Sequence, residues 1–127
     1  YAVAAALARP GAPVLAAMGD GTAGFHLAEF ETAMRTGAAF VCVVGSDGLW
    51  NAEHQLQLRA FGPDRTHGCD LGPARYDRAA EALGAWGAHV RSPEELAPTL
   101  RAAFAARSPA LVQVDIAPLP APAAPSG

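Results

Sequence analysis

Residues 19–57 read GDGTAGFHLAEFETAMRTGAAFVCVVGSDGLWNAEHQLQ, and the pattern within this stretch decides the fold. The apolar run at 14–18 leads into it and predicts a buried strand that ends in a tight loop at the Gly-Asp-Gly start. Residues 24–36 have helical periodicity, and the apolar, β-branched run at 40–44 predicts a second buried strand. That strand also ends in a turn of Gly, Ser and Asp. A strand, a helix and a strand in this order predict a parallel βαβ unit.

The same alternation continues along the rest of the chain. Ser92, Pro93 and Glu95 have the capping-box spacing, with Pro at the first helical position. The expected elements are helices at 51–60, 75–85 and 93–107, a loop at 62–72, and strands at 88–90 and 110–116. This order predicts an α/β fold, a three-layer sandwich whose mainly parallel sheet is covered by helices on both faces.

The length predicts a single domain over residues 1–117, because 127 residues suit one core. Residues 1–8 read as a helix with no cap before them, so we expect a partial domain that is truncated at its N-terminal side. Residues 118–127 are rich in Pro and Ala, and we expect them to form a mobile tail.

Composition and charge exclude several classes of partner. The formal net charge is −3 and no run of Lys or Arg occurs, so nucleic acid is not an expected partner. No apolar stretch approaches the roughly 20 residues of a membrane span, so no membrane association is expected. Of the two cysteines, Cys42 lies in an apolar strand-like run, where a reduced thiol is expected. We therefore expect a cytoplasmic protein.

The two Gly- and Asp-containing turns predict a binding site. In a parallel sheet ligands bind beyond the carboxyl ends of the strands, and both turns follow a strand. Glycines and a helix N-terminus favour a bound phosphate, whereas Asp20 in the first turn would repel it unless a cation lay between them. Asp47 in the second turn supplies another carboxylate, and Mg²⁺ is commonly held by carboxylate and phosphate oxygens. The sequence thus predicts a metal–diphosphate site.

Residues 19–57 resemble the thiamine-diphosphate-binding motif, which begins with Gly-Asp-Gly and ends near a pair of asparagines. The resemblance is to the acetolactate synthase-like and 2-hydroxyacyl-CoA lyase-like branch, in which a Glu-x-x-Thr-Ala run is typical, and residues 29–33 read Glu-Phe-Glu-Thr-Ala. It is strongest over 13–60 and continues in weaker form to about residue 117. The implied fold is the thiamine-diphosphate-binding fold, and the segment would be its diphosphate-binding domain.

The resemblance implies particular ligands for Mg²⁺ and for the diphosphate. Asp20, Asp47 and the backbone oxygen of Leu49 would bind the metal. The residues implied to bind the cofactor are Gly19, Asp20, Gly21, Thr22, Ala23 and Asp47. The motif departs from the family at two positions, since Ser46 and Asp47 stand where the two asparagines are usual. The added negative charge of Asp47 should make cofactor binding more dependent on the metal.

The segment after the second turn is implied to lie on the substrate side. Glu53 falls where decarboxylase-like relatives have an acidic residue, and it is the candidate catalytic group for proton transfer. Trp50, Asn51 and His54 are further candidates for contacts with substrate, although Trp50 has an ordinary alternative as a packing residue.

By resemblance, the parent protein is a lyase or transferase that makes or breaks a carbon–carbon bond next to a carbonyl. Acetolactate synthase-like carboligation, 2-oxo acid decarboxylation and 2-hydroxyacyl-CoA cleavage all remain open, with a small 2-oxo acid or an acyl-CoA as substrate. In this family the activating glutamate comes from a pyrimidine-binding domain, which would lie in the same chain or on a partner subunit. This segment alone is therefore expected to be inactive, and a homodimer or homotetramer is expected.

Two other functions are weighed against this interpretation. Phosphatases of the haloacid dehalogenase type also carry Gly-Asp-Gly after a strand, but they need a nucleophilic aspartate after an upstream strand, and none is present here. A non-catalytic cofactor-binding or assembly module of the same fold is the second alternative, and it stays open because of Ser46 and Asp47. Cofactor binding without turnover would support that alternative.

Overall fold

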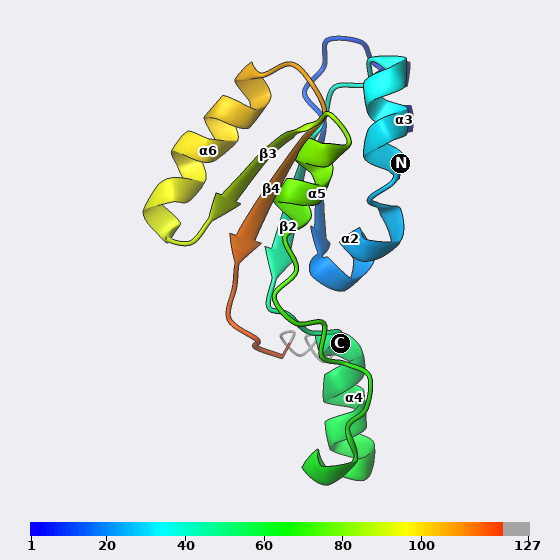
Figure 1. Cartoon of the computed structure of the whole chain (residues 1–127), viewed down its shortest axis with the longest axis vertical. Helices are drawn as coiled ribbons and strands as arrows, with labels where there is room; N and C mark the ends of the chain where they lie inside the picture. The colour runs from blue at the N-terminus through cyan, green and yellow to red at the C-terminus, as the bar shows by residue number, and fades with distance from the viewer. Residues whose placement is uncertain (121–127) are drawn as a thin grey trace, which may run out of the picture.

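The computed structural model describes residues 1–120 and contains a four-stranded, fully parallel sheet with helices on both faces (Figure 1). In chain order the elements are α1 (Ala2–Ala8), β1 (Leu15–Gly19), α2 (Asp20–His26), α3 (Glu29–Thr36), β2 (Val41–Ser46), α4 (Asn51–Phe61), the 3₁₀ turn η1 (Pro63–Arg65), α5 (Tyr76–Ala82), β3 (Trp86–Val90), α6 (Pro93–Ala105) and β4 (Ala110–Asp115). The strand order is β1-β2-β4-β3. The predicted α/β sandwich is confirmed. The expected tail at 118–127 lies beyond residue 120 for the most part, outside the described residues.

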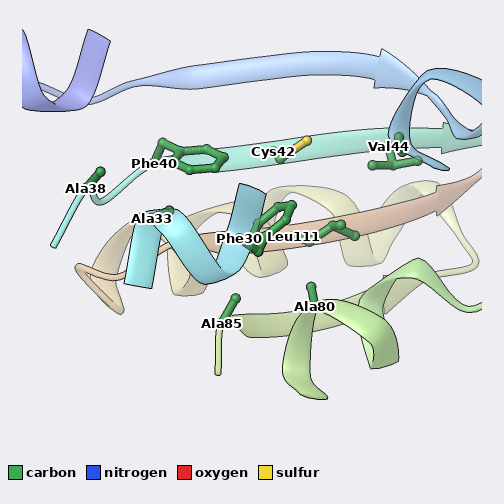
Figure 2. Close-up of a cluster of buried hydrophobic side chains, with 10 residues drawn as sticks. Phe30, Ala33, Ala38, Phe40, Cys42, Val44, Ala80, Ala85 and Leu111 are labelled. Atoms are coloured by element: carbon green, nitrogen blue, oxygen red, sulfur yellow. The ribbon is translucent and has the colours of Figure 1, made fainter. Parts of the chain in front are cut away.

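The sheet separates two apolar clusters, because successive side chains of a strand point to opposite faces. On one face, Cys42 and Val44 of β2 pack with Phe30 of α3 and Ala80 of α5 (Figure 2). On the other face, α6 covers a cluster that contains Val41, Val90, Ala103, Ala110 and Val112. The small alanines let the helices approach the sheet closely, which explains the Ala-rich composition.

The first cluster contains the larger side chains. Leu111 is fully buried, and the Phe30 and Phe40 rings lie 5.4 Å apart between centroids. Burial of each such side chain contributes about 1.5–3 kcal/mol relative to exposure. Cys42 is a free, buried thiol, as expected, and burial raises its pKa to about 11. The core therefore fixes β2 between its two neighbours.

The strand register brings the two Gly/Asp turns to one edge of the sheet. Gly19 at the end of β1 lies beside Gly45 in β2, and Ser46 lies beside Asp115 of β4. All four strands point toward the same end of the molecule, the end from which α4 extends (Figure 1). The carboxyl ends of β1, β2 and β4 thus lie side by side, and we call this edge of the sheet the platform.

Helix α4 projects beyond this platform, and none of its residues is buried. The segment just before α4 is held in place by hydrogen bonds to residues 69–71, which follow η1. Trp50 donates its N–H to the Cys69 carbonyl, and Leu71 donates its N–H to the Gly48 carbonyl, both at 2.8 Å. These two bonds form a short antiparallel bridge between residues 49 and 70, which holds the second turn in place.

The expected single helix at 24–36 is wrong in two respects. The helix begins earlier, at Asp20, so the Gly-Asp-Gly stretch is a strand end and a first helical turn rather than a loop. It is also interrupted at residues 27–28, where Phe30 and Glu31 donate to carbonyls three residues back. Such i→i−3 bonds tighten a turn and redirect the chain. Because of this break, α2 and α3 are two separate helices. Helix α3 packs Phe30 into the core.

The expected capping box at the start of α6 is also wrong. The Ser92 side chain makes no capping hydrogen bond, and Glu95 Oε2 instead accepts the Arg91 N–H at 2.8 Å. The helix still begins at Pro93, because Pro is preorganised for a first helical position. Within residues 1–120 none of the helices has the length and apolar character needed to cross a membrane.

Candidate functional site

Asp20 is the buried centre of the candidate site. It is the first residue of α2, directly after β1, and only 3% of its surface is exposed. Its Oδ1 accepts the Gly21 N–H at 2.9 Å, and its Oδ2 accepts the Ser46 hydroxyl at 3.1 Å and the Gly48 N–H at 2.8 Å. A buried carboxylate needs such donors. They fix its orientation and join the ends of β1 and β2.

Gly48 has a backbone conformation that this contact requires. Its φ is +74°, in the left-handed region that glycine adopts without steric cost. In this conformation the turn folds back, so that the Gly48 N–H points toward Asp20. A side chain at this position would strain the turn and weaken the link between the two strand ends.

Asp47 lies in the same turn and is partly buried. Its Oδ1 accepts the Leu49 N–H at 3.0 Å, and its Oδ2 accepts from Asn51 Nδ2 at 2.9 Å. The first contact is an Asx turn, which sets the path of the chain into α4. Asp20 and Asp47 are thus both held by protein donors.

A cavity of about 520 Å³ opens on the Asp47 side of this platform. Residues that line it include Asp47, Leu49, Arg75, His89 and Asp115. The cavity therefore joins the second turn to the ends of β3 and β4. Thr22 and Ala23 lie elsewhere, along a second cavity of about 790 Å³ between α1, β1 and α2.

Trp50 covers the first turn of α2. A side-chain carbon placed on Gly21 would lie 2.8 Å from the Trp50 ring, so only glycine fits there. The ring also lies 5.3 Å from that of Phe25, between centroids, and 74% of Phe25 is exposed. Trp50 thus packs on α2 and Phe25, and its contact with substrate stays a prediction. The exposed Phe25 extends this aromatic surface toward solvent.

The remaining predicted site residues on α4 have different settings. Glu53 is exposed on the first turn of the helix. His54 is half-buried, and among residues 1–120 no hydrogen-bond partner reaches its Nδ1. Asn51 bonds to Asp47 rather than standing free.

Sequence reasoning missed a polar cluster under the cavity. Gln113 of β4 is buried, accepts the Tyr76 N–H at 2.9 Å and donates to the Ala74 carbonyl at 3.0 Å. Next to it, Arg75 binds the buried Asp77 through two hydrogen bonds, which hold the pKa of Asp77 below its usual range. Gln113 sits in a mostly apolar strand run, and its partners at residues 74 and 76 depend on tertiary packing, so the sequence did not predict this cluster.

Tyr76 lies close to the first turn as well. Burial, and then the negative charge of Asp20, raise the pKa of the Tyr76 hydroxyl. That hydroxyl lies 3.7 Å from the position of a side-chain carbon at Gly24. It therefore faces α2. His89 and Asp115, at the ends of β3 and β4, form a further pair at the cavity wall.

The oxygen atoms at the two turns fit a hard divalent cation. A carboxylate offers about four lone-pair positions. Three of those on Asp20 are occupied by protein donors, which leaves one on Oδ1. Within residues 1–120 no group of three or more His, Cys, Asp and Glu residues surrounds a metal position. Mg²⁺ is commonly held by one or two carboxylates together with phosphate and water oxygens.

Comparison with known proteins agrees with this arrangement. Residues 1–114 match the family model of the thiamine pyrophosphate enzyme C-terminal TPP-binding domain. The chain is 41% identical over 115 residues to a probable acetolactate synthase of Mycobacterium bovis, covering 90% of this chain and 21% of that protein. It is 37% identical over 125 residues to a 2-hydroxyacyl-CoA lyase of Arabidopsis thaliana, covering 93% and 21%.

A solved structure is also similar. The thiamine diphosphate-dependent 4-hydroxybenzoylformate decarboxylase of Rhodococcus jostii superposes with a TM-score of 0.84 at 26% identity, covering 91% of this chain and 22% of that one. The chain thus spans about a fifth of the length of these relatives. Since the family model matches nearly all of the described residues, the chain belongs to the thiamine pyrophosphate enzymes, as a C-terminal TPP-binding domain of the acetolactate synthase-like and 2-hydroxyacyl-CoA lyase-like branch.

Proposed function

We propose that this domain binds thiamine diphosphate through Mg²⁺, held by Asp20, Asp47 and the backbone oxygen of Leu49. The observation that carries the proposal is the contact of the Asp20 carboxylate with both Ser46 and Gly48. It brings the Gly-Asp-Gly turn and the Asp47 turn to one point at the sheet edge. Gly19, Gly21, Thr22 and Ala23 would complete the diphosphate site from the start of α2, with Thr22 and Ala23 on the side of the second cavity.

The parent enzyme, in this proposal, makes or breaks a carbon–carbon bond next to a carbonyl. Bound thiamine diphosphate supplies a carbanion nucleophile and a ring that accepts the electron pair from the bond that breaks. Glu53 would hold or move a proton on the substrate side, supported by its place on the exposed first turn of α4. His54 and the aromatic surface of Trp50 and Phe25 would border the substrate.

The substrate would be a small 2-oxo acid or an acyl-CoA, in line with the names of the similar proteins. A pyrimidine-binding domain would complete the site, in the same chain or on a partner subunit, within a homodimer or homotetramer. The domain alone would then be inactive. Two free cysteines, both buried, suit the proposed cytoplasmic location.

Asp47→Ala in the full-length protein tests the ligand assignment. It removes one of the two proposed carboxylate ligands, so Mg²⁺-dependent binding of thiamine diphosphate should weaken at least about tenfold. Asp64→Asn, on the exposed η1 turn, removes a negative charge of the same kind without touching the site and serves as the control. Unchanged affinity in Asp47→Ala would contradict the assignment.

A further inference from the structure

The aspartate of the second turn, Asp47, makes a direct side-chain contact with one neighbour, Asn51. Both carboxylate oxygens of Asp47 accept a hydrogen bond, one from the Leu49 N–H and one from Asn51 Nδ2, at 3.0 and 2.9 Å. A carboxylate can accept at both oxygens, whereas an asparagine at position 47 would present one acceptor and one donor. The local geometry therefore requires a carboxylate at this position.

The orientation of the Asn51 amide follows from its partners. Its Nδ2 also donates to the Leu119 carbonyl at 2.9 Å, and its Oδ1 accepts from Gln55 Nε2 at 3.1 Å. Two acceptors face one end of the amide and a donor faces the other, so a reversed amide would lose all three contacts. Asn51 cannot adapt to an asparagine at 47 without breaking its bond to Leu119.

We infer that Asn51 is a positioning residue for the proposed metal ligand Asp47. The inference rests on the proposed function, because it assigns Asn51 a role toward the same metal. The Asn51 amide holds the Asp47 carboxylate in one rotamer, and its donor offsets part of the extra negative charge. The lone pairs of Asp47 not used by Leu49 and Asn51 are left for Mg²⁺.

This role differs from the predicted contact of Asn51 with substrate. Both amide hydrogens of Asn51 are directed to Asp47 and Leu119, and its oxygen is directed to Gln55. A substrate could bind this amide only by displacing one of these partners. Spaced four residues apart, Asp47, Asn51 and Gln55 instead form a continuous chain of hydrogen bonds along the start of α4.

A double-mutant cycle in the full-length protein tests the inference. Asn51→Leu keeps the branched shape of the side chain and removes its hydrogen bonds, Asp47→Asn removes the second acceptor, and the third variant combines them. For each, thiamine diphosphate is titrated calorimetrically at several Mg²⁺ concentrations, which gives an apparent Mg²⁺ affinity. Asp64→Asn is the matched control for the change of charge. Circular dichroism and the thermal midpoint check the fold, and Asn51→Ala replaces Asn51→Leu if the latter does not fold.

Each single substitution should weaken the apparent Mg²⁺ affinity about tenfold, because Asn51→Leu removes a hydrogen bond to the charged ligand and Asp47→Asn removes the ligand's charge. The double variant should be no weaker than Asp47→Asn alone, because Asn51 then has no carboxylate to position. Three results would each overturn the inference. They are unchanged affinity in the Asn51 variants, losses that add up in the double variant, and tighter binding in Asp47→Asn. If the unsubstituted protein shows no Mg²⁺-dependent binding, the proposed function itself fails, and the inference fails with it.

Discussion

Ser46 donates its hydroxyl to the Oδ2 of Asp20 at 3.1 Å, across the ends of two neighbouring strands. The contact joins residues 26 positions apart in the chain, at the edge of the sheet where the proposed metal would lie. A position that departs from the family motif thus makes a direct bond to Asp20, the buried one of the two proposed carboxylate ligands. Ser46 and the Gly48 N–H together fix one oxygen of Asp20 and leave a free lone pair on the other.

Ser46→Ala should therefore weaken Mg²⁺-dependent binding of thiamine diphosphate by about three- to tenfold, because Asp20 loses one of its donors. Calorimetric titration of the full-length protein measures the change. Thr36→Ala removes a hydroxyl that bonds only within α3, and it should leave the affinity as it is. Equal affinities in Ser46→Ala and Thr36→Ala would show that Ser46 does not support the ligand.

Gly21→Ala should lower the stability of the fold, whereas Gly19→Ala should leave it nearly unchanged. A methyl group on Gly21 would lie 2.8 Å from the Trp50 ring, while one on Gly19 meets no atom within 4 Å. We expect Gly21→Ala to lower the thermal midpoint by several degrees and to change the fluorescence of Trp50, since overpacking costs about 1–3 kcal/mol. Identical behaviour of the two alanine variants would contradict the close packing of Trp50 on α2.

The sequence predicts where the two turns lie, but it does not predict the hydrogen bonds that orient their side chains. The apolar runs and Gly/Asp turns located both strands and placed Asp20 and Asp47 at one edge, because parallel strands align their carboxyl ends. The partner of Ser46 could not be read from the sequence, since it depends on strand pairing. The start of α2 at Asp20 was missed because glycines indicate a loop, whereas the packing of Trp50 on Gly21 selects a helix.

Arg75→Gln should destabilise α5 far more than Arg78→Gln. Arg75 pairs with Asp77, whose side chain is only 3% exposed, whereas Arg78 pairs with the 37% exposed side chain of Glu81. A buried carboxylate left without its partner is costly, but a surface pair contributes little. Hydrogen exchange of α5 in the full-length protein should show protection reduced about tenfold in Arg75→Gln. A similar small change in both variants would contradict the account.

The same pair predicts a pH dependence. Arg75 lowers the pKa of Asp77 in the folded protein below its ordinary value of 3.8, so the unfolded chain binds a proton more readily. The stabilisation is present above 3.8 and is lost as the pH falls through the lowered pKa. Denaturation midpoints of the unsubstituted protein and Arg75→Gln should therefore differ at pH 7 and converge in acid. A constant difference across this range would argue against the ion pair as the cause.

Glu53→Gln should separate turnover from binding. Glu53 is exposed at the start of α4, and its side chain makes no hydrogen bond to either turn. Its replacement should therefore leave the cofactor affinity within about twofold of the original value. Loss of a proton-transfer group should slow turnover of a small 2-oxo acid by about a hundredfold or more. Glu31→Gln, on the far helix α3, is the control. Normal turnover in Glu53→Gln would show that Glu53 is an ordinary solvated side chain.

The most direct test of the central claim is a calorimetric titration of thiamine diphosphate into the full-length protein, first with Mg²⁺ and then with a chelator in excess. If the turns of Asp20 and Asp47 form one metal–diphosphate site, binding is saturable with Mg²⁺ and is lost with the chelator, because two carboxylates and a diphosphate repel one another without the cation. Equal binding under both conditions, or no binding under either, would contradict the claim.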